Sequence, residues 1–211
     1  RLKNWWDGKC IAVIGPTASG KNSLFNKLKN ENTPIEYIQT RGAEEVGTFH
    51  FSWQLPDSTN TEFKCKKSIN VGGEIDERER YWLQSCLEAD VIFYLIDFER
   101  LSRTPAETKD RVKSDLKWLA SNIPQFKAGS SIHILVNKVD ILTSNCDSEE
   151  IVTVVKAGTE THLDNIESTA KKVLGPYFER ISGISPISMT DQHLFSIYFT
   201  AVLQSVSNPK A

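Results

Sequence analysis

The stretch that decides the fold reads Gly15-Pro16-Thr17-Ala18-Ser19-Gly20-Lys21. The apolar run 10–14 precedes it, and residues 23–28 follow it with the pattern of a helix. Strand, glycine loop and helix in this order suit a phosphate-binding loop, because the loop N–H groups and the helix N-terminus then face one anion. Glycines at both ends let the backbone curl, and the lysine can span two phosphates. The stretch therefore predicts a nucleotide-binding chain. A plain glycine turn is the alternative, and the flanking strand and helix weigh against it.

A second motif lies far downstream, where the apolar run 132–136 ends in Asn137-Lys138-Val139-Asp140. Four such residues after a strand often form only a turn into the next helix. Their chemistry is more specific, because a carboxylate at Asp140 can accept from the N1–H and the exocyclic amine of guanine. Asn137 would tie the loop to its neighbours, and the stem of Lys138 would cover the base. The two motifs together predict a guanine nucleotide, GTP or GDP.

Composition narrows the class of protein. The 211 residues carry 25 Lys and Arg against 27 Asp and Glu, and a net charge of −2 leaves no basic footprint for a nucleic-acid duplex. No apolar run approaches the length of about 18 residues that a membrane span needs. The chain begins at Arg1, so we expect residues 1–9 to be an N-terminal extension, such as a trimmed linker, before a single domain over residues 10–207. We expect membrane association only through residues outside this chain.

Apolar periodicity predicts an alternation of strands and helices. The expected strands are 10–14, 45–54, 62–70, 91–97, 132–137 and 184–188, and the expected helices are 21–30, 76–88, 106–121, 164–180 and 190–206. This alternation is typical of a doubly wound α/β fold. The pair 45–54 and 62–70 is the exception and reads as a β-hairpin. The predicted fold class is a three-layer α/β domain with a mostly parallel six-stranded sheet and one antiparallel hairpin strand.

The order of these motifs resembles the Ras superfamily of small GTPases, which are P-loop G domains, and its Arf-like branch in particular. Val71-Gly72-Gly73-Glu74, followed by Arg78 and Trp82, is similar to the Arf-type glycine motif with its downstream Arg and Trp. Thr40-Arg41-Gly42 is similar to the first switch of the family, and Ser188-Met189-Thr190 to its Ser-Ala-Lys box. Residues 141–163 and the N-terminus lie outside the resemblance, and 141–163 reads as an insertion.

The resemblance implies a molecular switch on the cytoplasmic side of the cell, in the cytoplasm or on the cytoplasmic face of a membrane. Segments 36–48 and 72–82 would respond to the γ-phosphate and contact an effector or regulator protein. The implied nucleotide-binding residues are Gly15, Pro16, Thr17, Ala18, Ser19, Gly20, Lys21, Asn22, Ser23, Asn137, Lys138, Asp140, Ser188 and Met189. The implied catalytic positions are Thr40, Gly73 and Glu74, and the implied magnesium positions are Asn22, Thr40 and Asn70.

Three of these positions depart from the family where its chemistry occurs. The family has Ser or Thr at 22, Asp at 70 and, in Arf-type proteins, Gln at 74, whereas this chain has Asn22, Asn70 and Glu74. Magnesium prefers hard oxygen ligands and carboxylates, so two neutral amides are expected to hold it weakly. Ser23 is an alternative metal ligand, displaced by one residue. Glu74 has two open roles, as a base or as a charge that repels the γ-phosphate.

The departures leave several functions open. One is a guanine-nucleotide switch with weak or absent hydrolysis, and a second is a non-hydrolysing module whose fold the nucleotide stabilises. A third is an engineered GDP-favouring variant of an active GTPase, since Asn at position 22 is a familiar engineered change in small GTPases. If the protein does not select guanine, the alternative is a P-loop ATPase or kinase. Arg78 and Arg80 are interpreted as a solvated, mixed-charge helix start rather than an internal arginine finger.

Overall fold

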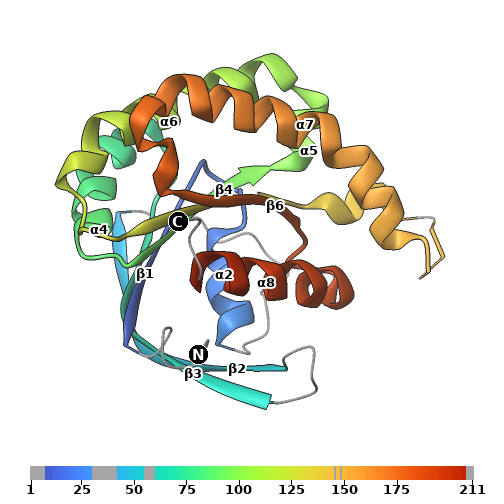
Figure 1. The fold of residues 1–211 in the computed structure, drawn as a ribbon, viewed down its shortest axis with the longest axis horizontal. Coiled ribbons are helices and arrows are strands. Elements are labelled where there is room, and N and C mark those ends of the chain that lie inside the picture. Colours follow the sequence, from blue (N-terminus) through green and yellow to red (C-terminus); the bar gives the residue numbers. More distant parts are fainter. Residues whose placement is uncertain (1–7, 30–41, 55–59, 145, 148, 208–211) are drawn as a thin grey trace.

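The described part of the chain forms one six-stranded sheet with helices on both faces (Figure 1). The computed structural model describes residues 8–29, 42–54, 60–144, 146–147 and 149–207. The strands are β1 (Lys9–Ile14), β2 (Ala43–Gln54), β3 (Asn60–Val71), β4 (Val91–Asp97), β5 (Ser131–Asn137) and β6 (Ile181–Ile187). The α-helices are α2 (Lys21–Leu28), α3 (Ile75–Glu77), α4 (Leu83–Leu87), α5 (Phe98–Arg103), α6 (Pro105–Asn122), α7 (Ile151–Leu174) and α8 (Gln192–Ser207).

The sheet has the strand order β2-β3-β1-β4-β5-β6. All neighbouring strands run parallel except β2, which pairs antiparallel with β3 at the edge. Every residue of β4 and β5 is buried, because helices cover both faces of the central strands. The predicted fold class is therefore confirmed, with the hairpin supplying the single antiparallel strand.

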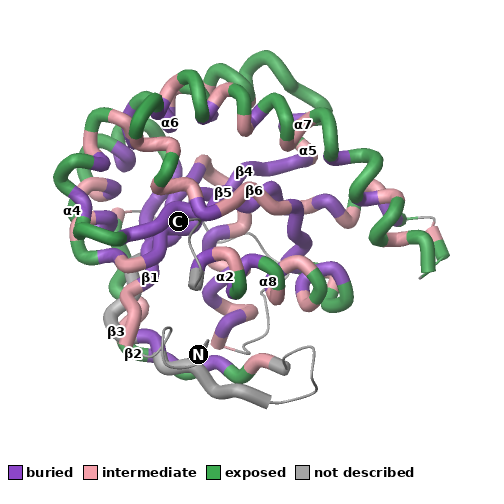
Figure 2. The backbone as a smooth tube through the Cα atoms, in the orientation of Figure 1, coloured by how far each residue is buried: buried purple, intermediate pink, exposed green. Residues whose placement is uncertain are grey.

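Two apolar cores lie on opposite faces of this sheet. On one face α6 and α7 pack over Tyr94 and Trp82, and on the other α2 and α8 pack around Phe25 and Phe199. Figure 2 shows the buried sheet between helices whose outer sides are exposed. Because the parallel strands all point the same way, the loops that follow β1, β4, β5 and β6 meet at one edge of the sheet. No helix in the described part of the chain is long and apolar enough to cross a membrane.

The long helix α7 corrects the prediction of a helix over 164–180. It begins at Ile151, so the expected start at 164 is wrong, and much of the insertion-like segment 141–163 is helix. It ends at Leu174, and the chain continues to Arg180 as the 3₁₀ segment η4 (Gly175–Arg180). Its first half hides the helical pattern, because Gly158 is a poor helix former. A side chain at 158 would contact the end of the Leu142 side chain at 2.8 Å, so Leu142 would have to shift to admit it.

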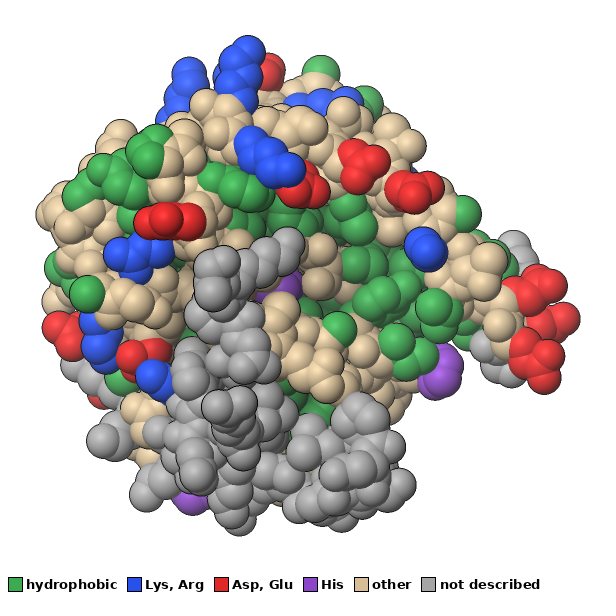
Figure 3. Space-filling view, in the orientation of Figure 1, with side chains coloured by type: hydrophobic (Ala, Val, Ile, Leu, Met, Phe, Trp, Pro, Cys, Tyr) green, Lys and Arg blue, Asp and Glu red, His purple; other side chains and the backbone are tan. Residues whose placement is uncertain are grey.

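The start of α7 reaches away from the sheet (Figure 1). Exposed acidic side chains gather there, at Asp147, Glu149 and Glu150 (Figure 3). Elsewhere on that face, charges of both signs are interspersed over α6 and α7 (Figure 3).

The expected helix 76–88 is divided into three pieces. A π-helical turn, η1 (Arg78–Trp82), separates α3 from α4. Such turns widen a helix locally and are frequent at functional sites. Here the turn includes Trp82, whose indole N–H donates to the Gly72 carbonyl at 3.1 Å. The helix is thereby tied to the turn formed by Gly72 and Gly73, called the Gly-Gly turn below.

Candidate nucleotide site

Residues 15–21, called the phosphate loop below, connect β1 to α2 and need glycine at both ends. Gly15 has φ 142° and Gly20 has φ 101°, which L side chains rarely adopt. A side chain at Gly15 would collide with the Leu95 carbonyl, and one at Gly20 would collide with the Asn137 amide. The loop is therefore packed between the ends of β4 and β5. Pro16, Thr17 and Ala18 form its outer part, and Asn22 and Ser23 lie in the first turn of α2.

Lys21 points back over its own loop. Its ammonium donates to the Gly15 carbonyl at 2.9 Å and to the Pro16 carbonyl at 2.8 Å. Burial, together with the nearby charge of Arg111, lowers the pKa of Lys21 to about 8. The buried Ser19 hydroxyl has no hydrogen-bond partner among the described residues. A curled backbone, a buried cation and an unsatisfied hydroxyl in one loop fit an anion such as a phosphate.

The Gly-Gly turn lies directly on the phosphate loop. A side chain at Gly73 would collide with the backbone of Pro16 and Thr17 and would come within 2.8 Å of the Gly15 carbonyl. The Thr17 hydroxyl donates to the Glu74 carboxylate at 2.8 Å. Two of the positions assigned to the γ-phosphate region, Gly73 and Glu74, are thus in contact with the loop. Thr40 lies outside the described residues.

Asn137 joins the phosphate loop to two other loops. Its amide N–H donates to the Ser19 carbonyl at 3.0 Å, and its amide oxygen accepts from the Met189 N–H at 3.2 Å. The Ser188 hydroxyl donates to the Asp140 carboxylate at 2.7 Å. Residues 137–140, called the 137–140 box below, are therefore held against residues 15–21 and 188–189 by direct bonds.

Asp97 is a site residue that the sequence motifs missed. It ends the buried strand β4 and lies beside Asn137 in the sheet register. Its carboxylate accepts from the Lys138 ammonium at 2.6 Å and from the Arg100 N–H at 3.2 Å, so it also caps α5. Lys138 itself has φ 71°. The sequence did carry one signal for this contact, namely a carboxylate at the last position of an apolar strand.

The two amides at the expected magnesium positions bind each other. Asn70 donates through its side-chain N–H to the Asn22 side-chain oxygen at 2.8 Å. Two neutral amides replace a hydroxyl and a carboxylate, and one amide oxygen already accepts a hydrogen bond. This donor set suits a hard dication poorly.

Arg78 differs from its expected setting. It is buried and donates to Asp115 at 2.9 Å and to the Ser114 hydroxyl at 3.0 Å, both on α6. Interpreting it as part of a solvated helix start is therefore wrong, whereas Arg80 is exposed. Arg78 and Trp82 are four residues apart and are both buried, so they share the side of the helix that faces the core.

Asp115 is the centre of a buried cluster that the sequence did not predict. Its carboxylate accepts from Arg78, from the Tyr94 hydroxyl at 3.0 Å and from Arg111 at 2.9 and 3.0 Å. Arg111 also donates to the Gly73 carbonyl at 2.9 Å. These four residues, Asp115, Arg78, Tyr94 and Arg111, are called the Asp115 cluster below. The cluster connects α6 and β4 to the turn that covers the phosphate loop.

Glu77 joins the Gly-Gly turn to the start of β2. Its buried carboxylate accepts from the Gly42 N–H at 2.9 Å and from the Glu74 N–H at 3.2 Å. Gly72 in turn donates its N–H to the Gly42 carbonyl at 2.8 Å. The described ends of segments 36–48 and 72–82 are thereby bonded to each other.

Comparison with protein-family profiles finds no match, and comparison with curated proteins finds none. Solved structures do resemble the chain. A mutation variant of SsGBP aligns with TM-score 0.54 at 18% identity over 94% of this chain and 55% of that one. The RocCORdC part of Methanosarcina barkeri Roco2, bound to GDP, aligns with TM-score 0.53 at 16% identity over 96% of this chain and 49% of that one.

The mammalian SRP receptor structure aligns with TM-score 0.57 at 13% identity over 95% of this chain and 99% of that one. The chain spans about half the length of the first two proteins. At these identities the likeness shows the fold alone. The chain has the α/β fold of a P-loop GTPase, with six mostly parallel strands and one antiparallel strand.

Proposed function

We propose that residues 10–207 form a guanine-nucleotide-binding domain that holds GTP or GDP between the phosphate loop and the 137–140 box. One observation carries this proposal, namely the bridge that Asn137 makes from the Ser19 carbonyl to the Met189 N–H. A site that reads a base while holding its phosphates needs a fixed spacing between the two subsites. Asn137 provides that spacing with two buried bonds.

Each described residue of the site has a proposed role. Lys21 and the loop N–H groups bind the phosphates, with the positive end of α2 behind them. Asp140 accepts from the N1–H and amine of guanine, and Ser188 orients its carboxylate through the 2.7 Å bond. The stem of Lys138 covers the base, and the bond to Asp97 fixes its ammonium. Asp140 would also exclude adenine, because adenine presents a different pattern of hydrogen-bond donors and acceptors to this carboxylate.

We further propose an Arf-like molecular switch, in which segments 36–48 and 72–82 change with the nucleotide and contact an effector or regulator protein. The bonds of Glu77 to residues 42 and 74 support coupling between the two segments. A solved structure of the same fold is bound to GDP, which is consistent with a guanine nucleotide here. The expected location is the cytoplasm or the cytoplasmic face of a membrane.

Hydrolysis is proposed to be weak or absent. Magnesium, when bound, supplies charge that offsets the developing charge on the phosphates. The paired amides of Asn22 and Asn70 are expected to hold it poorly, and Glu74 adds a negative charge beside Thr17. The alternative is a module in which the nucleotide only stabilises the fold. Single-turnover GTP hydrolysis with and without magnesium separates slow hydrolysis from a non-hydrolysing module, because only a hydrolysing domain gives metal-dependent turnover.

An Asp140→Asn exchange tests the proposal through base specificity. The new amide can donate to the carbonyl that xanthine has in place of the guanine amine. We therefore expect weaker GDP binding and stronger binding of xanthosine diphosphate, measured by competition against a fluorescent nucleotide. Asp110→Asn is the matched control, because Asp110 is exposed on α6. If Asp140→Asn left the ratio of GDP to xanthosine diphosphate affinity unchanged, residues 137–140 would not read the base.

A further inference from the structure

The Gly-Gly turn covers the outer part of the phosphate loop, at Pro16 and Thr17. Gly73 packs on the backbone of Pro16 and Thr17 so closely that no side chain fits between them. The Glu74 carboxylate holds the Thr17 hydroxyl and brings a negative charge to the same point. A nucleotide whose last phosphate reaches the Thr17 N–H must therefore displace this turn, whereas a shorter one need not.

Arg111 holds the Gly73 end of this turn, whereas Trp82 and Gly42 bind its Gly72 end. The Nε of Arg111 donates to both oxygens of Asp115, and its Nη2 donates to the Gly73 carbonyl. Asp115 is fully buried, and Tyr94 and Arg78 bind it as well. The guanidinium is therefore fixed by the core of the domain, and its bond to the Gly73 carbonyl joins the turn to that core.

The bonds of Arg111 favour a holding role over direct phosphate binding. A phosphate-binding arginine would present an uncompensated charge to the anion, whereas Arg111 is paired with the Asp115 carboxylate. Its remaining bond is to a neutral carbonyl of the turn. Losing one hydrogen bond to a charged group changes an equilibrium constant by about tenfold to hundredfold.

We propose that Arg111, positioned by Asp115, holds Gly73 down on the phosphate loop and thereby makes the domain prefer guanosine diphosphate over guanosine triphosphate. This inference rests on the proposed function. Arg111 is a positioning residue in this account, since it acts through the Gly-Gly turn. Releasing the turn would favour the triphosphate without creating any new contact to it.

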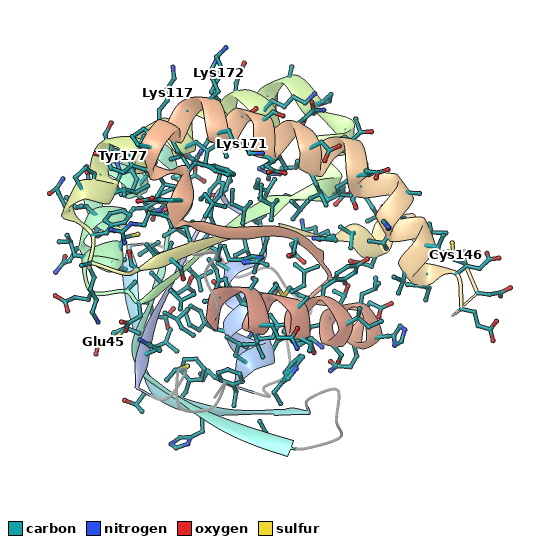
Figure 4. The ribbon with its side chains drawn as sticks, in the orientation of Figure 1. Glu45, Lys117, Cys146, Lys171, Lys172 and Tyr177 are labelled. Atoms are coloured by element: carbon teal, nitrogen blue, oxygen red, sulfur yellow. The ribbon has the colours of Figure 1, made fainter. Side chains whose placement is uncertain are left out.

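The test compares the affinities of GDP and a non-hydrolysable GTP analogue, measured by competition on the full chain. We expect the unaltered protein to prefer GDP. Arg111→Ala is expected to move the ratio of the two affinities about tenfold toward the triphosphate, and to change GDP affinity itself by less than about threefold. Lys117→Ala is the control, because Lys117 is exposed on the same helix and points away from the domain (Figure 4).

Arg111→Lys separates this role from a purely structural one. A lysine keeps a cation beside Asp115, so the urea unfolding midpoint should recover toward that of the unaltered protein. A single ammonium does not reproduce the planar bonds to both Asp115 and Gly73, so the shift in the nucleotide ratio should remain.

The outcomes also separate this inference from the proposed function. The holding role is wrong if Arg111→Ala and Arg111→Lys both leave the ratio of the GDP affinity to the GTP-analogue affinity unchanged. It is also wrong if the unaltered protein prefers the triphosphate analogue. In both cases guanine binding stands. If the unaltered protein binds neither nucleotide, both proposals fail.

Discussion

Replacing Asn137 with alanine removes the bridge on which the site depends. Asn137 is buried, and the exchange leaves two main-chain groups, the Ser19 carbonyl and the Met189 N–H, without the partners they have at 3.0 and 3.2 Å. Each lost partner of a buried group costs about 1 to 3 kcal/mol, and water that enters the loop edge lowers the sum, so we expect about 2 to 4 kcal/mol. The free energy of unfolding should fall by this amount even without nucleotide.

Urea unfolding measures this loss. With a slope of about 2 to 3 kcal/mol per molar urea, the unfolding midpoint should fall by about 1 M. Asn165→Ala is the matched control, because Asn165 is exposed on α7 and should change stability by less than about 0.5 kcal/mol. A loss below about 0.5 kcal/mol for Asn137→Ala would show that the bridge does not hold the three loops together.

Three further predictions concern the phosphate site, the metal positions and acid stability. Lys21→Ala should weaken GDP binding through the loss of a charge-assisted contact of about 1.5 to 3 kcal/mol, and a change below about twofold would place the phosphates elsewhere. Intrinsic GTP turnover should not exceed about 10⁻⁴ s⁻¹. The double exchange Asn22→Thr and Asn70→Asp should make GDP release more sensitive to a chelator, because a hydroxyl and a carboxylate hold magnesium better than two amides. Fast chelator-sensitive release in the unaltered chain would contradict this. Burial lowers the pKa of His133 to about 3, so below about pH 6.5 the unfolded chain binds a proton that the folded chain does not. Stability should therefore fall from about pH 6.5 toward pH 3, and a His133→Asn variant that loses stability equally steeply in urea titrations would refute this cause.

Short sequence patterns predicted the phosphate loop and the central strands, because backbone geometry and burial restrict which residues fit there. Gly15 and Gly20 mark a loop that only glycine can make, and the buried runs of β4 and β5 are apolar because helices cover both faces. The first half of α7 escaped prediction because β-branched residues and Gly158 obscure its helical period.

The Asp115 cluster shows why part of the site was not predictable from motifs. Its members come from η1, β4 and α6, and only the folded sheet brings them together. A partial signal existed, since Asp115 lies on the apolar face of α6 beside Val112 and Leu116. A charged residue on such a face needs a buried partner, but sequence alone does not name Arg78, Arg111 or Tyr94.

The most direct test of the central claim is a competition titration of the unaltered chain, in which GDP and ATP displace a fluorescent guanine nucleotide. If Asp140 reads guanine, GDP should displace the probe and ATP should fail to do so at comparable concentrations. Equal displacement by GDP and ATP would contradict guanine recognition and would favour a P-loop ATPase or kinase.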